Sequence, residues 1–66
     1  MARETNLERI AREIADARRI VDEKRASVVW LKARGLPAEE GETLLRMFEA
    51  YLAELEDRER KLRGKS

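Results

Sequence analysis

The sequence predicts an all-α protein, an antiparallel two-helix hairpin that dimerises into a four-helix bundle. Three observations support this fold class. Residues 5–34 contain neither glycine nor proline and are rich in helix-forming residues. Apolar residues recur at alternating steps of three and four along this stretch and along residues 37–63. The only proline, Pro37, stands between the two stretches, two residues after Gly35.

The first helix is expected over about residues 5–34, with a signal at each end. Thr5 precedes Glu8 by three residues, which fits a capping box in which each side chain accepts a hydrogen bond from the other residue's backbone N–H. At the far end, Gly35 suits the left-handed conformation that follows many helices. Leu36 would then fold back onto Leu31 or Lys32, as in a Schellman ending.

The second helix is expected over about residues 37–63, after a turn at residues 35–37. Pro37 fits the first helical turn, where its missing N–H leaves no bond unmade. The chain would form a single domain over residues 1–66, with frayed ends at 1–4 and 64–66. On the second helix, five acid–base pairs have the acid four residues before the base, which favours helix: Glu42–Arg46, Glu54–Arg58, Glu56–Arg60, Asp57–Lys61 and Glu59–Arg63.

Each helix has one heptad seam, and the larger apolar residues of the two seams form the expected hairpin core. Antiparallel pairing about the turn places Leu31 opposite Gly41 and Ala17 opposite Leu55, so that large residues meet small ones. Ile14 opposite a glutamate at position 59 would be a weak layer. The expected core comprises Ile10, Ile14, Val21, Val28, Leu31, Leu45, Phe48, Leu52, Leu55 and Leu62.

Charge distinguishes the two helices from each other. Residues 6–34 carry eight basic and five acidic side chains, whereas residues 37–63 carry five basic and eight acidic ones. The helices therefore attract each other, although salt screens this attraction. Over the whole chain, 15 basic and 14 acidic residues leave a net charge of +1. This balance argues against a dedicated nucleic-acid-binding protein, which is usually strongly basic.

The length of the chain indicates that one hairpin needs a partner. A domain of 66 residues buries only about 60% of the surface that its unfolded chain exposes. Small domains usually add a disulfide, a metal or a partner subunit, and the absence of Cys and His leaves the partner subunit. A second copy, or another protein, would bind the apolar residues outside the seams: Ala26, Val29, Trp30, Ala33, Leu44, Met47 and Tyr51.

Trp30 is compatible with three interpretations. It could be a half-exposed residue without a partner, a contact between two copies of the chain, or a docking point for a different protein. Tyr51 allows a simpler interpretation as well, because its ring could close the edge of the core while its hydroxyl group stays in water. The sequence leaves these alternatives open.

The composition offers little for catalysis. Without His or Cys, the candidate nucleophiles are hydroxyl groups with no evident partner base: Thr5, Ser27, Thr43, Tyr51 and Ser66. The glutamates that open the second helix could chelate a cation or could simply complement the helix dipole. We therefore expect no enzymatic activity, no cofactor and no metal site.

A small nucleic-acid-binding regulator is the alternative function. It would use the basic side of the first helix, where acidic residues are interleaved and would repel phosphate. The basic residues in question are Arg9, Arg12, Arg18, Arg19, Lys24 and Arg25.

A membrane partner is not expected. No stretch has about 18 consecutive apolar residues, and neither helix has a basic face opposite an apolar one. The N-terminal residues lack an apolar run like that of a secretory signal. We expect a cytoplasmic protein.

A longer pattern connects the two helices. It reads V-x-x-L-x-x-x-G-L followed by L-L-x-x-F-E-x-x-L, and includes Ile20, Val21, Val28, Leu31, Gly35, Leu44, Leu45, Phe48, Glu49 and Leu52. Over residues 17–55, this pattern resembles short uncharacterised helical-hairpin proteins of high-GC proteobacteria. The resemblance implies a bacterial helical hairpin and no particular activity. In architecture alone, the expected dimer is similar to dimeric helical-hairpin regulators of plasmid copy number, and no motif here matches their RNA-binding surface.

Overall fold

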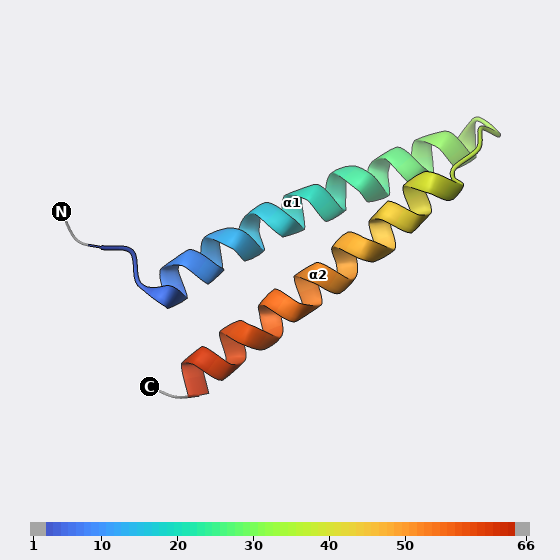
Figure 1. Cartoon of the computed structure of the whole chain (residues 1–66). Helices are drawn as coiled ribbons and strands as arrows, with labels where there is room; N and C mark the ends of the chain where they lie inside the picture. The colour runs from blue at the N-terminus through green and yellow to red at the C-terminus, as the bar shows by residue number, and fades with distance from the viewer. Residues whose placement is uncertain (1–2, 65–66) are drawn as a thin grey trace.

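The computed structural model describes residues 3–64, which form two α-helices, α1 over Asn6–Ala33 and α2 over Glu39–Gly64. The helices run antiparallel and pack against each other along their length (Figure 1). The all-α fold with two packed helices is therefore confirmed. Of the predicted frayed ends, residues 1–2 and 65–66 lie outside the described residues; residues 3–5 are not helical, whereas Gly64 still belongs to α2.

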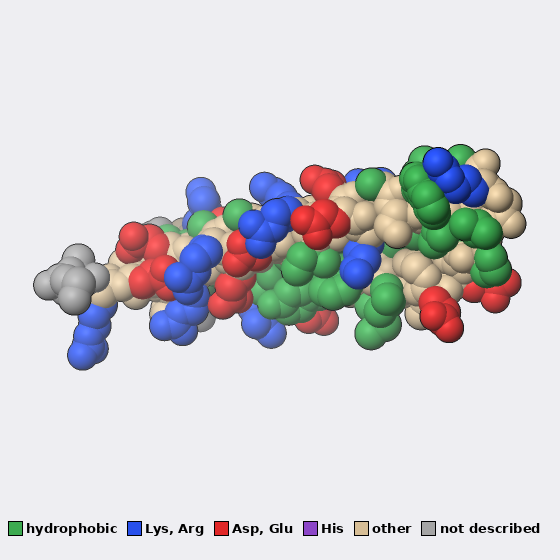
Figure 2. Space-filling view, turned by 90° about the horizontal axis from the view of Figure 1, so that it is seen from above, with side chains coloured by type: hydrophobic (Ala, Val, Ile, Leu, Met, Phe, Trp, Pro, Cys, Tyr) green, Lys and Arg blue, Asp and Glu red, His purple; other side chains and the backbone are tan. Residues whose placement is uncertain are grey.

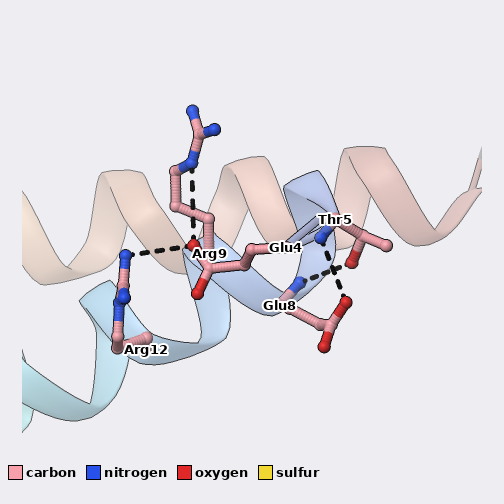
Figure 3. A network of polar contacts seen from close by, with 5 residues as sticks. All are labelled: Glu4, Thr5, Glu8, Arg9 and Arg12. Atoms are coloured by element: carbon pink, nitrogen blue, oxygen red, sulfur yellow. Dashed lines mark hydrogen bonds and ion pairs between the residues drawn. The ribbon is translucent and has the colours of Figure 1, made fainter. Parts of the chain in front are cut away.

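The capping box at the start of α1 is present as predicted. The backbone N–H of Thr5 donates to Oε1 of Glu8 at 3.0 Å, and the N–H of Glu8 donates to Oγ1 of Thr5 at 3.0 Å (Figure 3). The carboxylate of Glu4 lies beside this box, 3.0 Å from Nη2 of Arg12 and 3.9 Å from Nε of Arg9. The box thus gives partners to the N–H groups of Thr5 and Glu8, and Glu4 supplies a negative charge beside two arginines of the first turns.

The turn ends α1 with the predicted Schellman motif. Gly35 has φ = +66°, in the left-handed region that side chains with a Cβ rarely adopt. The N–H of Leu36 donates to the carbonyl of Leu31 at 2.9 Å, and the N–H of Gly35 donates to the carbonyl of Lys32 at 3.1 Å. These two bonds close the motif, so Gly35 reverses the direction of the chain.

The second helix begins later than predicted. Pro37 precedes α2 instead of occupying its first turn, and Ala38 is the residue whose carbonyl accepts the first helical bond, from the N–H of Glu42 at 2.8 Å. The reason is the separation of the helices. Packed helix axes lie about 8–10 Å apart, and about three extended residues are needed to cross that distance. Leu36, Pro37 and Ala38 supply this link.

The core lies between the helices and is centred on Leu55, of which only 1% is exposed. Ile10, Ile14 and Ala17 form one buried cluster with Leu55, so Ala17 and Leu55 belong to the same part of the core. Ile14 is buried, and the carboxylate of Glu59 lies 3.4 Å from Nη2 of Arg63.

Half of the predicted core is only half-buried. Five members are buried: Ile10, Ile14, Val21, Val28 and Leu55. The other five are of intermediate exposure: Leu31, Leu45, Phe48, Leu52 and Leu62. The physical reason is that each helix of a single hairpin is covered along one side only. Ala17 and Ala38, which lie on the seams but outside the predicted core, are buried too.

Gly41 has a different neighbour from the one predicted. A Cβ atom placed on Gly41 would lie 3.2 Å from Cγ2 of Val28, and no atom of Leu31 would lie within 4 Å. The expected pairing of Gly41 with Leu31 is therefore wrong by about one helical turn. The missing side chain of Gly41 lets α2 approach α1 closely at Val28.

Candidate interaction surface

Large apolar side chains remain exposed on the hairpin, mainly in the half near the turn. Those most exposed are Val29, Trp30, Leu36, Leu44, Met47 and Tyr51. All seven residues predicted to form the dimer or partner interface are exposed, including Ala26 and Ala33. Figure 2 shows apolar side chains gathered at the end of the rod near the turn and around its middle, while charged side chains crowd the other end. Leu36 was expected only as a turn residue, and the structure adds it to this exposed set.

On α2, the exposed apolar residues form a stripe. Leu44, Met47, Phe48 and Tyr51 line a shallow groove along the helix, with the spacing of one helical face. Exposed fractions are 42% for Leu44, 62% for Met47 and 46% for Tyr51. Phe48 thus contributes to the core on one side and to this groove on the other.

The opposite side of the seam is ionic. Three pairs join the helices there, each with the base on α1 and the acid on α2: Arg18–Glu56 at 3.0 Å, Arg25–Glu49 at 3.1 Å and Lys32–Glu42 at 3.4 Å. Successive pairs are one heptad apart on both helices, so they form a ladder along one flank. We call these six residues the ionic flank.

The seam separates the ionic flank from the apolar stripe. Each glutamate of the ladder directly follows a seam position of α2, whereas Leu44, Met47 and Tyr51 directly precede one. At about 100° per residue, the two sets lie on opposite sides of the seam. On α1 the same rule places Ile20 and Trp30 beside the stripe. We call Ile20, Trp30, Leu44, Met47 and Tyr51 the apolar flank.

The predicted interface residues are not all on one face. Val29 follows the seam residue Val28 and therefore lies on the ionic side, while Ala26 and Ala33 point away from α2. Trp30 belongs to the apolar flank, and the guanidinium carbon of Arg34 lies 4.1 Å from the centre of its ring. This contact holds the indole against its own helix by a cation–π interaction. Only four of the seven predicted residues can therefore contact one flat partner surface together with Ile20.

The ion pairs in the structure differ in part from the predicted ones. Of the five predicted pairs within α2, the structure contains Asp57–Lys61 and Glu59–Arg63. Glu42 and Glu56 instead pair across the seam, and Arg60 pairs with Asp57. Most of the basic residues proposed as a nucleic-acid contact also have acidic neighbours within 4 Å: Arg9, Arg12, Arg18, Arg19 and Arg25. Phosphate binding at this side would have to compete with these carboxylates.

Two carboxyl groups outside both flanks have altered acidity. The backbone and side-chain hydrogen bonds of Thr5 hold the pKa of Glu8 below its ordinary value of 4.5. A hydrogen bond from Lys61 and its positive charge, together with Arg60, lower the pKa of Asp57 from 3.8. Glu8 belongs to the cap of α1 and Asp57 pairs with bases on α2, and both lie away from the apolar flank.

Other kinds of site receive no support from the geometry. Within residues 3–64, no three His, Cys, Asp or Glu side chains gather as ligands for a metal ion. Of the hydroxyl groups considered as nucleophiles, that of Thr5 serves the capping box and that of Thr43 donates to the carbonyl of Glu39 at 3.0 Å. In the same part of the chain, neither helix combines the length and the apolar character needed to cross a membrane.

Comparison with protein-family models, with curated proteins and with solved structures gives no match for this chain. The resemblance to proteobacterial helical-hairpin proteins therefore stays a prediction.

Proposed function

We propose that this chain is a non-enzymatic protein-interaction module that acts as a homodimer, in which two hairpins pack into a four-helix bundle. The observation that supports the proposal is the apolar flank. Its α2 part, Leu44, Met47 and Tyr51, is 42–62% exposed and borders the core directly through Phe48. Exposed apolar surface that continues a core is typical of an interface. The back of α1, with Ala26 and Ala33, would stay free to contact a different protein.

The total surface of the hairpin supports association. The chain exposes 5463 Å², whereas a compact monomer of 7.7 kDa would expose roughly 4,300 Å². One hairpin thus buries about half of the surface of its unfolded chain, less than the roughly 60% typical of this size. Pairing of two copies would supply the missing burial without a disulfide or a metal.

The half-buried seam residues support the same arrangement. Leu31, Phe48 and Leu52 lie at the border between the seam and solvent in the single hairpin. In a four-helix bundle, residues at such positions face the central core and are covered by the second pair of helices. Dimerisation would therefore complete the core that the heptad pattern predicts.

Measurement of the mass in solution tests the proposal. Light scattering coupled to gel filtration should give about 15 kDa, twice the 7.7 kDa of one chain, at micromolar concentrations. Met47→Glu should give a helical monomer, because it buries a charge in the interface. Val29→Glu is a matched control, because Val29 and Met47 are both 62% exposed but Val29 lies on the ionic side. A wild-type chain that is fully helical at 8 kDa over the whole concentration range would contradict the proposal.

A further inference from the structure

We infer that the two hairpins pair side by side with their turns at the same end, so that the apolar flank of α1 in one copy packs against the apolar flank of α2 in the other. This inference rests on the proposed dimer and adds its orientation. Two observations support it: the unequal distribution of apolar residues along the rod, and the charges at the ends of the apolar flank.

The first observation is the concentration of apolar side chains near the turn. Trp30, Leu36, Leu44 and Met47 lie in that half, while on the face seen in Figure 2 charged side chains crowd the end away from the turn. With both turns at one end, apolar halves cover each other. An end-for-end dimer would place Leu44 and Trp30 against the charged half of the second copy, and would cover little apolar surface.

The ladder of ion pairs and the contact of Val28 with Gly41 together show which residues lie near the same level of the rod. Through long side chains the ladder joins Arg18 to Glu56, Arg25 to Glu49 and Lys32 to Glu42. The direct contact of Val28 with Gly41 shifts the level on α2 by up to five residues toward its N-terminus. A two-fold axis parallel to the helices preserves these levels between copies. On the apolar flank, the same levels place Trp30 opposite Leu44 of the second copy. By the same rule, Ile20 meets Glu54, whose methylene groups can cover it while the carboxylate reaches solvent.

The second observation is the set of flanking charges. Arg34 lies near the level of Glu40, and Asp16 near that of Arg58, all four on the side of the apolar flank. Among the described residues, neither Glu40 nor Arg58 takes part in any ion pair. The guanidinium group of Arg34 lies over the ring of Trp30, and the carboxylate of Asp16 has one ion pair, with Arg19 at 3.5 Å. Turns at the same end bring each acid beside a base of the other copy.

The charges of the two helices favour this pairing as well. Helix dipoles do not decide the orientation, because neighbouring helices run antiparallel in both dimers. Basic α1 would meet acidic α2 in both contacts, since residues 6–34 carry eight basic and five acidic side chains and residues 37–63 the reverse. In the end-for-end dimer, α1 would instead face α1, and Glu23 would approach Glu23 of the second copy near the two-fold axis.

Mixing two charge variants tests the contact between Arg34 and Glu40. Arg34→Glu alone gives two acids at this contact, and Glu40→Arg alone gives two bases, so each homodimer should bind about tenfold more weakly than wild type at low salt. In a mixture, each contact of the heterodimer joins an acid to a base. Native mass spectrometry should therefore show mainly heterodimer. Glu39→Arg is the matched control for Glu40→Arg, because it makes the same change of charge near the start of α2 but lies outside the apolar flank.

A distance measurement tests the orientation independently. The chain has no Cys, so Leu36→Cys carries one spin label at the exposed turn. Turns at the same end predict a distance far below the 49 Å length of the rod; a distance near that length would overturn the inference. Ala50→Cys, on the outer side of α2 near the middle, reports a short distance in any side-by-side dimer.

The two labels separate the possible failures. A short distance from Ala50→Cys with a long one from Leu36→Cys would refute the orientation and keep the proposed dimer. No dipolar coupling from either label at concentrations where the wild-type chain is folded would refute the dimer itself. Equal amounts of homodimer and heterodimer in the mixture would likewise overturn the contact between Arg34 and Glu40.

Discussion

Val28 of α1 packs against Gly41 of α2: Cγ2 of Val28 lies 3.2 Å from the position that a Cβ atom on Gly41 would occupy. A glycine inside a helix normally costs about 1 kcal/mol relative to alanine. Here the lack of a Cβ on Gly41 leaves room for the side chain of Val28. This room is needed because the branched side chain of Val28 has little freedom to move aside. The packing of α1 on α2 therefore opposes the helix propensity at this position.

This contact gives the first prediction. Gly41→Ala should fail to stabilise the protein, because overpacking against Val28 offsets the gain in helix propensity. In the Val28→Ala background the same substitution should stabilise by about 1 kcal/mol. Urea unfolding of the four proteins in a double-mutant cycle measures the coupling. A gain of about 1 kcal/mol from Gly41→Ala in the wild-type background would show that Val28 yields easily.

A second prediction concerns Leu55 and Phe48, which were expected to be equivalent core residues. Leu55→Ala should cost about 2–5 kcal/mol in any background, because Leu55 is buried within one hairpin. Phe48→Ala should cost less in the Met47→Glu background than in the wild-type background, since a second copy covers part of its ring only in the dimer. Chemical unfolding followed by circular dichroism compares the four variants. Equal costs of Phe48→Ala in both backgrounds would mean that Phe48 is buried by the single hairpin.

The third prediction tests the cap of α1. Thr5→Ala removes the acceptor for the N–H of Glu8 and should destabilise the protein by about 1 kcal/mol. Thr43→Ala is the control, because its hydroxyl group bonds a carbonyl that is already part of the helix ladder. Thermal midpoints of the two variants should differ clearly. A similar midpoint for both would place the stability of the hairpin elsewhere than the first turn.

The fourth prediction is a dependence of stability on pH. The pKa values of Glu8 and Asp57 are lowered in the folded chain from 4.5 and 3.8. Each carboxylate therefore stabilises the fold above its ordinary pKa, and this stabilisation is lost as the pH falls through the lowered pKa. The thermal midpoint should be level near neutral pH and should decrease below about pH 4.5.

Substitution separates these two groups from other acid effects. Glu8→Gln combined with Asp57→Asn should make the decrease at low pH shallower. Glu23→Gln is the control, because Glu23 is exposed and has no ion pair with any described residue. An unchanged slope in the double variant would assign the acid sensitivity to other carboxylates.

The sequence by itself determined the two helices and the backbone features at the ends of α1. The capping box of Thr5 and Glu8 and the reversal at Gly35 were predictable, because helix geometry alone brings these groups together. The two packed helices followed from the heptad seams. The Asp57–Lys61 pair was predictable in the same way, since both residues lie on one face of one helix.

Only the tertiary structure decided what depends on the axial shift and rotation of one helix against the other. Glu42 and Glu56 had predicted partners on α2, yet they bind Lys32 and Arg18 of α1. Gly41 meets Val28 instead of Leu31, and Phe48 stays half-buried. The sequence places these side chains around each helix but carries no measure of how the helices are offset. Packing at the closest contacts sets that offset, and with it the side of the hairpin that remains apolar.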